Sequence, residues 1–255
     1  MQPLQMHTSH KLECIDISKA YGNEGILSSV SLCAQKGEVI SVLGMSGSGK
    51  STLLKIVSGV TAPDSGSVII NGEDCTGQTG KVSFMRQDSL LMPWKTVLDN
   101  IILPLTISGI KKREAYRRAE QHLEYFGLES CKKLYPSQIS GGMAKRASLL
   151  RAYLFSSDIL LLDEPFSSLD TLTRISVYEW FSATVRELEM TAVLVTHDIT
   201  EAVYLSDKVY IIKGRPADIA LEMKIAVDKK DYRTTTASSA FHAAADELAA
   251  AIFEG

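Results

Sequence analysis

The stretch GMSGSGKS, residues 44–51, decides the fold of this chain. It matches the phosphate-loop pattern GxxxxGK[ST], and it lies where a β-compatible apolar run gives way to a helix-compatible one. Glycines let the backbone curl so that its N–H groups converge on phosphate oxygens at the positive end of the following helix. We therefore predict an α/β nucleotide-binding core, in which ATP contacts Gly44, Met45, Ser46, Gly47, Ser48, Gly49, Lys50, Ser51 and Thr52.

Three of these residues have individual roles in the prediction. Lys50 is expected to reach the β and γ phosphates, Ser51 to ligate magnesium, and Thr52 to cap the anion cradle. A phosphate loop alone is compatible with kinases, GTPases and motor ATPases, so it does not define the reaction.

A pair of adjacent acids narrows the choice. The run ILLLDE, residues 159–164, reads as a buried strand that delivers Asp163 and Glu164 at its carboxyl end, where sheets of this architecture bind ligands. Asp163 is placed to hold magnesium directly or through water, and Glu164 can polarise an attacking water as a general base. The two motifs together predict a nucleoside triphosphatase.

Composition limits the partners and the compartment. A formal net charge of -3 and a pI near 6.0 give no global basic field, so we expect no nucleic-acid partner. No run approaches the roughly 20 apolar residues that cross a bilayer, and the start MQPLQMHTSHKLE lacks the features of a secretory signal. We therefore expect a cytoplasmic chain. We interpret one basic cluster as a solvated helix face: Lys111, Lys112, Arg113, Arg117 and Arg118.

The cysteines show no pairing pattern. Cys14, Cys33, Cys75 and Cys131 lie far apart and form no CxxC motif, so they suggest neither a metal site nor a redox dithiol. We expect them to be small and mostly buried thiols.

The order of elements predicts an α/β fold with two additions to the core. Residues 12–17, 29–34, 38–44 and 67–72 read as a small antiparallel layer around a buried central strand, with Asn71-Gly72 as a tight turn. Residues 88–156 are helical in character, and residues 111–128 carry apolar side chains at helical spacing: Ala115, Ala119, Leu123 and Phe126. TAVLVTHD reads as a second buried parallel strand, a hairpin follows Gly214, and an alanine-rich helix ends the chain.

The segment Ser140-Gly141-Gly142, 23 residues before Asp163, is where the sequence resembles the ABC transporter ATPase family. In that family this segment, with Ile139 before it, is the signature loop, which binds the γ-phosphate held by the partner subunit. The resemblance therefore implies a head-to-tail homodimer in which Ser140, Gly141, Gly142 and Met143 act on the partner's ATP. Met143 is a departure, because many members have glutamine there, and it puts the fine tuning of partner-site closure in doubt.

The resemblance covers nearly the whole chain and implies further site residues. Tyr21 matches the aromatic residue that stacks on adenine. Gln87 matches the glutamine that senses magnesium and the attacking water, and His197 matches the histidine that contacts the γ-phosphate. The loop that touches its twin across the dimer corresponds to Ser167, Ser168, Leu169 and Asp170. The other histidines show no such context, and we assign no role to His7, His10, His122 and His242.

The resemblance also implies an architecture. It is a RecA-like phosphate-loop NTPase core with an antiparallel β subdomain, at about 10–87 and 157–225, an inserted helical signature subdomain at about 88–156, and a helical tail at 227–255. All of these lie in one ABC ATPase domain spanning residues 1–255.

Two longer segments, SLLMPWKTVLDNIILPL and THDITEAVYLSDKV, resemble the ATPases of importers for nitrate, sulfonate and taurine. The resemblance implies ATP and Mg²⁺ as cofactors, a separate permease, an extracytoplasmic solute-binding protein met indirectly, and a peripheral position at the cytoplasmic face of the membrane. It also implies that the permease contacts Leu91, Met92, Pro93 and Trp94. The alternatives are an exporter or lipid-transporter ATPase, an ABC-type ATPase that moves no solute, and a small-molecule kinase. The signature loop and Glu164 disfavour the kinase.

Overall fold

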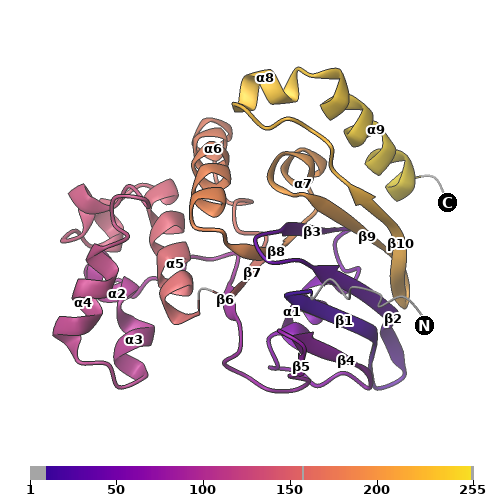
Figure 1. Cartoon of the computed structure of the whole chain (residues 1–255), viewed down its shortest axis with the longest axis horizontal. Helices are drawn as coiled ribbons and strands as arrows, with labels where there is room; N and C mark the ends of the chain where they lie inside the picture. Colours follow the sequence, from indigo (N-terminus) through magenta and orange to yellow (C-terminus); the bar gives the residue numbers. More distant parts are fainter. Residues whose placement is uncertain (1–9, 157, 254–255) are drawn as a thin grey trace, which may run out of the picture.

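The computed structural model of the chain describes residues 10–156 and 158–253, so the expected lack of a signal sequence at the start, and His7, lie outside the described residues. The strands are β1 (Leu12–Tyr21), β2 (Glu24–Ala34), β3 (Val39–Leu43), β4 (Ser65–Ile70), β5 (Glu73–Asp74), β6 (Ser83–Met85), β7 (Ile159–Asp163), β8 (Thr191–Thr196), β9 (Lys208–Gly214) and β10 (Ala217–Lys224). They form one sheet in the order β5-β4-β1-β2-β10-β9-β3-β8-β7-β6 (Figure 1).

The centre of this sheet is parallel and buried on both faces. Strands β9, β3, β8, β7 and β6 run parallel to one another. Along β7, Leu160 and Leu162 join one buried cluster, and Ile159 and Leu161 join the cluster on the opposite face. This alternation follows from the two-residue period of a strand, and helices covering both faces explain why the sequence is an unbroken apolar run. The α/β prediction is confirmed.

The antiparallel layer also exists, but the prediction of its position was wrong in one respect. Strand β1 pairs antiparallel with β2 and β4, and the Asn71-Gly72 turn, with both φ angles positive, joins β4 to β5. The central strand β3 does not pair with this layer, because the β9-β10 hairpin lies between them and continues the sheet through the Ala217–Leu27 pair. Strand pairing across about 190 residues of sequence carries no local signal.

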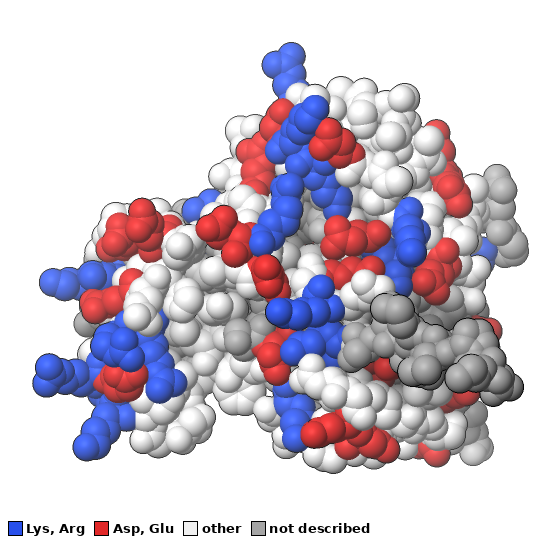
Figure 2. Space-filling model, viewed as in Figure 1, with Lys and Arg blue, Asp and Glu red and all other residues white. Residues whose placement is uncertain are grey.

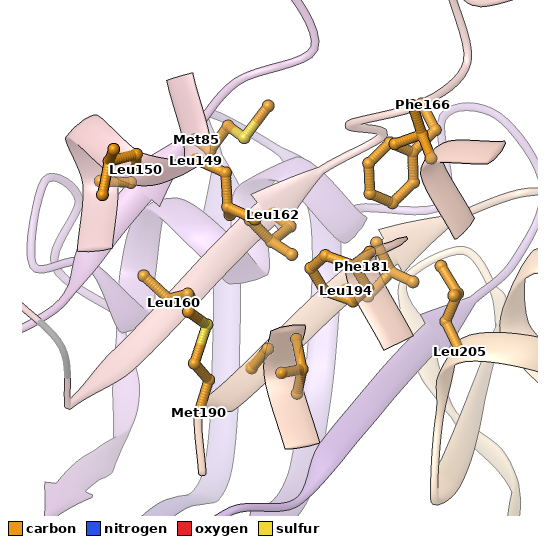
Figure 3. Close-up of a cluster of buried hydrophobic side chains, with 14 of the residues drawn as sticks. Met85, Leu149, Leu150, Leu160, Leu162, Phe166, Phe181, Met190, Leu194 and Leu205 are labelled. Carbon is orange, nitrogen blue, oxygen red and sulfur yellow. The ribbon is translucent and has the colours of Figure 1, made fainter. Parts of the chain in front are cut away.

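Helices cover the two faces and form a group at one end of the sheet (Figure 1). They are α1 (Lys50–Val57), α2 (Val97–Ile101), α3 (Leu103–Ile107), α4 (Lys112–Glu120), α5 (Gly141–Phe155), α6 (Thr171–Glu187), α7 (Ile199–Leu205), α8 (Tyr232–Thr236) and α9 (Ser239–Phe253). Figure 3 shows side chains of α5, α6 and α7 packing on β6, β7 and β8, among them Leu149, Phe181 and Leu205.

The predicted helix over 111–128 is shorter than expected. Helix α4 ends at Glu120, and the chain continues in turns to Gly127, whose φ of +62° is left-handed. Leu123 and Phe126 are nevertheless buried, as their spacing predicted, because those turns keep them on the same side. A residue with a side chain at position 127 would also meet the Arg146 guanidinium, 2.7 Å from its Cβ.

Helix α9 ends the described chain and packs on α7 and β9 through the buried side chains of Phe241 and Leu248. Three of the cysteines are buried and Cys33 is half-buried, which confirms the prediction. No helix within the described ranges is long and apolar enough to span a bilayer. Figure 2 shows basic and acidic side chains interspersed over one face, and on α4 the cations of Lys112, Arg117 and Arg118 pair with Asp99 and Glu114.

Candidate active site

The phosphate loop joins β3 to α1, and its glycines are needed for its path. Gly47 and Gly49 have φ angles of +81° and +87°, a region that side chains with a Cβ rarely adopt. Gly44 is needed for space, because a Cβ there would lie 2.6 Å from the carbonyl oxygen of Ile212. Gly49 is the N-cap residue of α1 and has no side chain to accept a hydrogen bond. The first amides of the helix therefore remain available to an anion.

Lys50 lies buried inside this loop. Its ammonium group donates to the carbonyl oxygens of Gly44 and Met45, each at 2.7 Å. Burial lowers the pKa of Lys50, and the nearby carboxylates of Glu164 and Asp163 oppose that shift. A desolvated ammonium group inside a glycine-rich loop is suited to bind a phosphate group. The Ser48 hydroxyl is also buried, with no hydrogen-bond partner among the residues described.

Ser51 and Asp163 lie side by side. The Ser51 hydroxyl donates to Asp163 Oδ1 at 3.2 Å. Burial raises the pKa of Asp163 and the neighbouring Glu164 adds to the rise, while Ser51, Arg86 and Lys50 lower it. Hydroxyl and carboxylate oxygens are ligands that Mg²⁺ prefers, and Mg²⁺ commonly completes its shell with phosphates and water. The donor set therefore fits a magnesium ion at this position.

Glu164 and His197 meet at the carboxyl ends of adjacent strands. Strands β7 and β8 are in a register that pairs Asp163 with Val195, and the Glu164 amide donates to the Val195 carbonyl at 2.9 Å. His197 directly follows β8, and its Nδ1 atom lies 3.1 Å from Glu164 Oε1. Glu164 has a φ of +44°, a strained conformation that is common at functional sites.

Gln87 reaches the same edge of the sheet. Strand β6 pairs in parallel with β7 so that Met85 lies opposite Leu162, which places Gln87 two residues further on, level with Glu164. The side chain of Gln87 is exposed. The backbone after it is held by α5, because the Lys145 ammonium group donates to the Gln87 carbonyl.

Two more residues of α5 hold the same loop, and sequence analysis did not identify them. The Ser148 hydroxyl donates to the Ser89 carbonyl at 2.7 Å, and the Arg151 guanidinium donates to the carbonyls of Ser89 and Leu90, both at 2.8 Å. With Lys145, these polar residues recur every three positions along α5, a spacing that could have indicated a shared helix face. The signature helix is thereby fixed to the loop that follows Gln87.

The predicted signature residues, 140–143, lie beside the predicted dimer-loop residues, 167–170. Ser140 caps α5, its hydroxyl accepting from the Met143 amide at 3.3 Å. A Cβ on Gly141 would lie 3.3 Å from Leu169, and one on Gly142 would lie 3.0 Å from the methyl group of Thr173. Met143 is half-buried and packs against the core. The signature segment is thus brought against the loop before α6.

The dimer-loop residues are themselves ordered by local hydrogen bonds. The Ser167 hydroxyl donates to the Glu164 carbonyl at 3.0 Å, and Asp170 caps α6 by accepting from the Thr173 amide at 3.1 Å. Leu169 is buried and Ser168 is exposed. The loop is therefore held to the Glu164 carbonyl at its beginning, and Leu169 near its end lies beside Gly141 at the start of α5.

Tyr21 ends β1 with its ring half exposed, and the Lys19 ammonium group lies 5.6 Å from the ring centroid. The neighbouring strand β2 touches the phosphate loop, since a Cβ on Gly49 would lie 2.8 Å from the side chain of Leu27. The Tyr21 ring is thus exposed on the β1-β2 strand pair that borders the phosphate loop, where a nucleotide base can reach it.

The fold and the site define a phosphate-loop ATPase of the α/β class. The ABC transporter family model matches residues 27–167. The chain is 39% identical to the formylaminopyrimidine import ATP-binding protein ThiZ of Halalkalibacterium halodurans, over 87% of each chain. It is 39% identical to the aliphatic sulfonates import ATP-binding protein SsuB of Burkholderia ambifaria, over 94% of this chain and 71% of that one. It is 33% identical to the nitrate import ATP-binding protein NrtD of Synechocystis, over 84% and 82%.

Solved structures agree. The dimeric ATP-binding cassette MJ0796, in a post-hydrolysis state bound to ADP and Pi, has 29% identity and a TM-score of 0.70, with 84% of this chain and 98% of that one covered. The fold is also that of cbiO1 from Clostridium perfringens, with 22% identity and a TM-score of 0.76, over 85% and 89%. This chain belongs to the ABC transporter family. It is an ATP-binding subunit of that family and hydrolyses ATP, as the motifs predicted.

Proposed function

We propose that this subunit energises the import of a small solute, of the nitrate, sulfonate and taurine class, through a separate permease. The observation that carries the ATPase chemistry is the convergence of Lys50, Ser51, Asp163, Glu164 and His197 at the carboxyl ends of β3, β7 and β8. The names of the relatives, which are import ATP-binding proteins, support import over export.

Each of these residues has a separate role in ATP hydrolysis. Lys50 exchanges the carbonyls of Gly44 and Met45 for the β and γ phosphates, and the loop amides bind the remaining oxygens. Ser51 and Asp163, together with Gln87, would hold Mg²⁺, which would neutralise charge on the phosphates. Glu164 accepts a proton from the attacking water.

His197 holds Glu164 in place from 3.1 Å and contacts the γ-phosphate. Tyr21 stacks on the adenine ring, since its half-exposed side chain lies on the β1-β2 strand pair, whose Leu27 borders the phosphate loop at Gly49.

A second copy completes each site. The segment of Ser140, Gly141, Gly142 and Met143 begins a helix whose first amides can bind a phosphate. Within its own chain this segment lies beside the following loop and helix, with Gly141 against Leu169 and Gly142 against Thr173. We propose that they bind the γ-phosphate held by the partner subunit in a head-to-tail homodimer. The dimeric state of MJ0796 supports this arrangement. The loop from Ser167 to Asp170 would then contact its twin.

The permease would dock where the segment after Gln87 leaves the sheet. Trp94 is 71% exposed and Leu90 57% exposed, and large apolar side chains of this kind commonly anchor protein interfaces. A mostly apolar groove of about 360 Å³ runs between the core and the helical group, lined by Val82, Phe84, Leu103, Ile107, Arg151 and Phe155. A cytoplasmic helix of the permease fits this chemistry.

This arrangement has consequences for the whole chain. The subunit would bind peripherally at the cytoplasmic face of the membrane, and an extracytoplasmic solute-binding protein would deliver the solute to the permease. Residues 88–156 would form a helical subdomain beside the core at about 10–87 and 157–225, with 227–255 as a helical tail, all within one ABC ATPase domain.

Affinity isolation of the tagged subunit from its own detergent-solubilised membranes tests the function. We expect a permease and a solute-binding protein to co-purify with ATPase activity. The identity of these two proteins then indicates the class of solute. Leu91, Met92, Pro93 and Trp94 are tested in the same way, with Trp94→Ala expected to reduce permease recovery while ATP binding is retained. Isolation of soluble partners alone would contradict the transport role.

A further inference from the structure

A cluster of polar side chains lies behind His197, between α6, the end of β8 and α7. Thr196 is 1% exposed and Glu201 is 3% exposed, while Arg174 and Asp198 are half-buried beside them. Burying polar groups costs free energy unless they are hydrogen-bonded. The hydrolysis chemistry described above does not use these four residues, so their arrangement needs another explanation.

Arg174 joins two segments of the site. Its Nη2 atom donates to the carbonyl oxygen of Leu169 at 2.9 Å, in the dimer loop. Its Nη1 atom lies 3.7 Å from Asp198 Oδ2, next to His197 in the chain. One planar guanidinium group thus spans the loop that would meet the partner subunit and the loop that carries the histidine.

The residues on both sides of His197 are fixed by a closed set of hydrogen bonds. The Asp198 amide donates to the Thr196 hydroxyl at 3.0 Å, and that hydroxyl donates to Glu201 Oε2 at 2.8 Å. The Glu201 amide in turn donates to Asp198 Oδ1 at 3.1 Å. Because Thr196 and Asp198 are both held, the backbone of His197 between them has little freedom.

The cluster is not arranged for stability alone. Arg174 Nε, the Tyr178 hydroxyl and Glu201 Oε1 are buried and have no hydrogen-bond partner among the residues described. Apolar side chains of similar volume commonly stabilise a protein as well as buried charges do. Buried polar groups that stay incompletely paired in a folded protein call for an explanation other than stability.

We propose that Arg174 is a positioning residue that couples the dimer loop to His197. Contact of the partner copy with the dimer loop moves the Leu169 carbonyl, Arg174 carries this displacement to Asp198, and the ring of Thr196, Asp198 and Glu201 sets the distance from His197 to Glu164. This coupling rests on the roles proposed above for His197 and Glu164. Through this coupling, the rate of ATP hydrolysis in each copy stays low until the partner copy is docked.

The test compares Arg174→Met with Arg186→Met in the full-length chain. Arg186 lies on the same helix and also donates to backbone carbonyls, those of Ser182 and Lys229, but it contacts neither loop. Each variant is assayed for kcat, for KM, for ATP affinity by titration and for its melting temperature. We expect Arg174→Met to lower kcat by about tenfold or more, since small displacements in a site have effects of that size, with ATP affinity unchanged. Arg186→Met should retain the wild-type kcat.

Substitution of Thr196 provides a second measurement with its own conservative control. Thr196→Val removes the hydroxyl and should lower kcat as Arg174→Met does. Thr196→Ser keeps the hydroxyl, and its kcat should equal that of the wild type. A merely structural role would lower the melting temperature without this separation of kcat from ATP affinity. Wild-type kcat in Arg174→Met, or equal losses of kcat in both arginine variants, would overturn the coupling.

His197→Ala and Glu164→Gln, assayed beside these variants, separate the two proposals. If both lose turnover while Arg174→Met does not, the coupling fails and the proposed site stands. If both retain turnover, the roles assigned to His197 and Glu164 fail, and the coupling fails with them.

Discussion

The Ser51 hydroxyl lies 3.2 Å from Asp163 Oδ1, although the two residues are 112 positions apart in the sequence. The first belongs to the phosphate loop and the second to the end of β7, so this contact joins the two motifs at one point. It is the geometry expected of two ligands that share a metal ion.

Removing the hydroxyl should weaken the magnesium site. We expect Ser51→Ala to raise the Mg²⁺ concentration needed for half-maximal ATPase activity by tenfold or more, about 1.4 kcal/mol. Ser51→Thr keeps the hydroxyl and is the matched control. An unchanged magnesium dependence in Ser51→Ala would contradict the assignment of this residue.

The phosphate loop should tolerate no side chain at its first glycine. A Cβ at position 44 would lie 2.6 Å from the Ile212 carbonyl, so Gly44→Ala must displace the loop from β9. Overpacking of this kind costs about 1–3 kcal/mol. Urea unfolding should show that loss together with weaker ATP binding, and Gly72→Ala, at a turn with open space around it, should leave ATP binding unchanged.

Glu201 should make stability depend on pH. Burial raises the pKa of Glu201 to about 8 from 4.5, with Asp198 and Glu164 adding to the rise and Thr196 and Arg174 opposing it. Between these values the unfolded chain releases the Glu201 proton and the folded chain retains it, so this group makes folding less favourable as the pH rises from about 4.5 to 8. The Tyr178 hydroxyl, which also faces the cluster, stays protonated throughout because burial and Glu201 raise its pKa.

Glu201→Gln removes this titration and keeps an acceptor for Thr196. We expect the free energy of unfolding of the variant to rise relative to wild type as the pH increases through that window, and to change little below pH 4.5. Urea denaturation at several pH values measures the difference. A pH-independent difference would show that Glu201 is ionised in the folded chain.

The tail should contribute stability through its packing on α7. Leu248 is fully buried between α9 and its neighbours, so Leu248→Ala should cost about 2–5 kcal/mol in the free energy of unfolding. Glu247→Ala, one position away on the exposed side, is the control and should stay within about 0.5 kcal/mol. Equal stabilities would indicate that α9 does not dock in solution.

The parts of the fold that sequence analysis predicted are those with a local signal. The phosphate loop and the buried strand before Asp163 have patterns that few other structures share, and both were found with their flanking elements. Strand β6 was missed, because its three residues are too few to show a periodicity. The end of α4 was missed because the apolar spacing continues past it into packed turns.

Sequence analysis predicted residues that the structure brings together, but not the contacts that support them. Ser51, Asp163 and Glu164 belong to sequence motifs, whereas Lys145 and Arg174 contact backbone carbonyls, and such contacts leave no mark on the sequence of the loops involved. Such contacts depend on which elements the fold brings together, and that depends on long-range pairing.

The variant Glu164→Gln tests the central claim most directly, when ATP-dependent dimerisation and turnover are measured in one sample by light scattering and phosphate release. Glutamine keeps the shape of the side chain beside His197 but cannot accept a proton from water. We predict that the variant with ATP and Mg²⁺ forms a stable dimer and that its turnover falls by about a hundredfold or more. Wild-type turnover, or a variant that stays monomeric with ATP bound, would contradict the account.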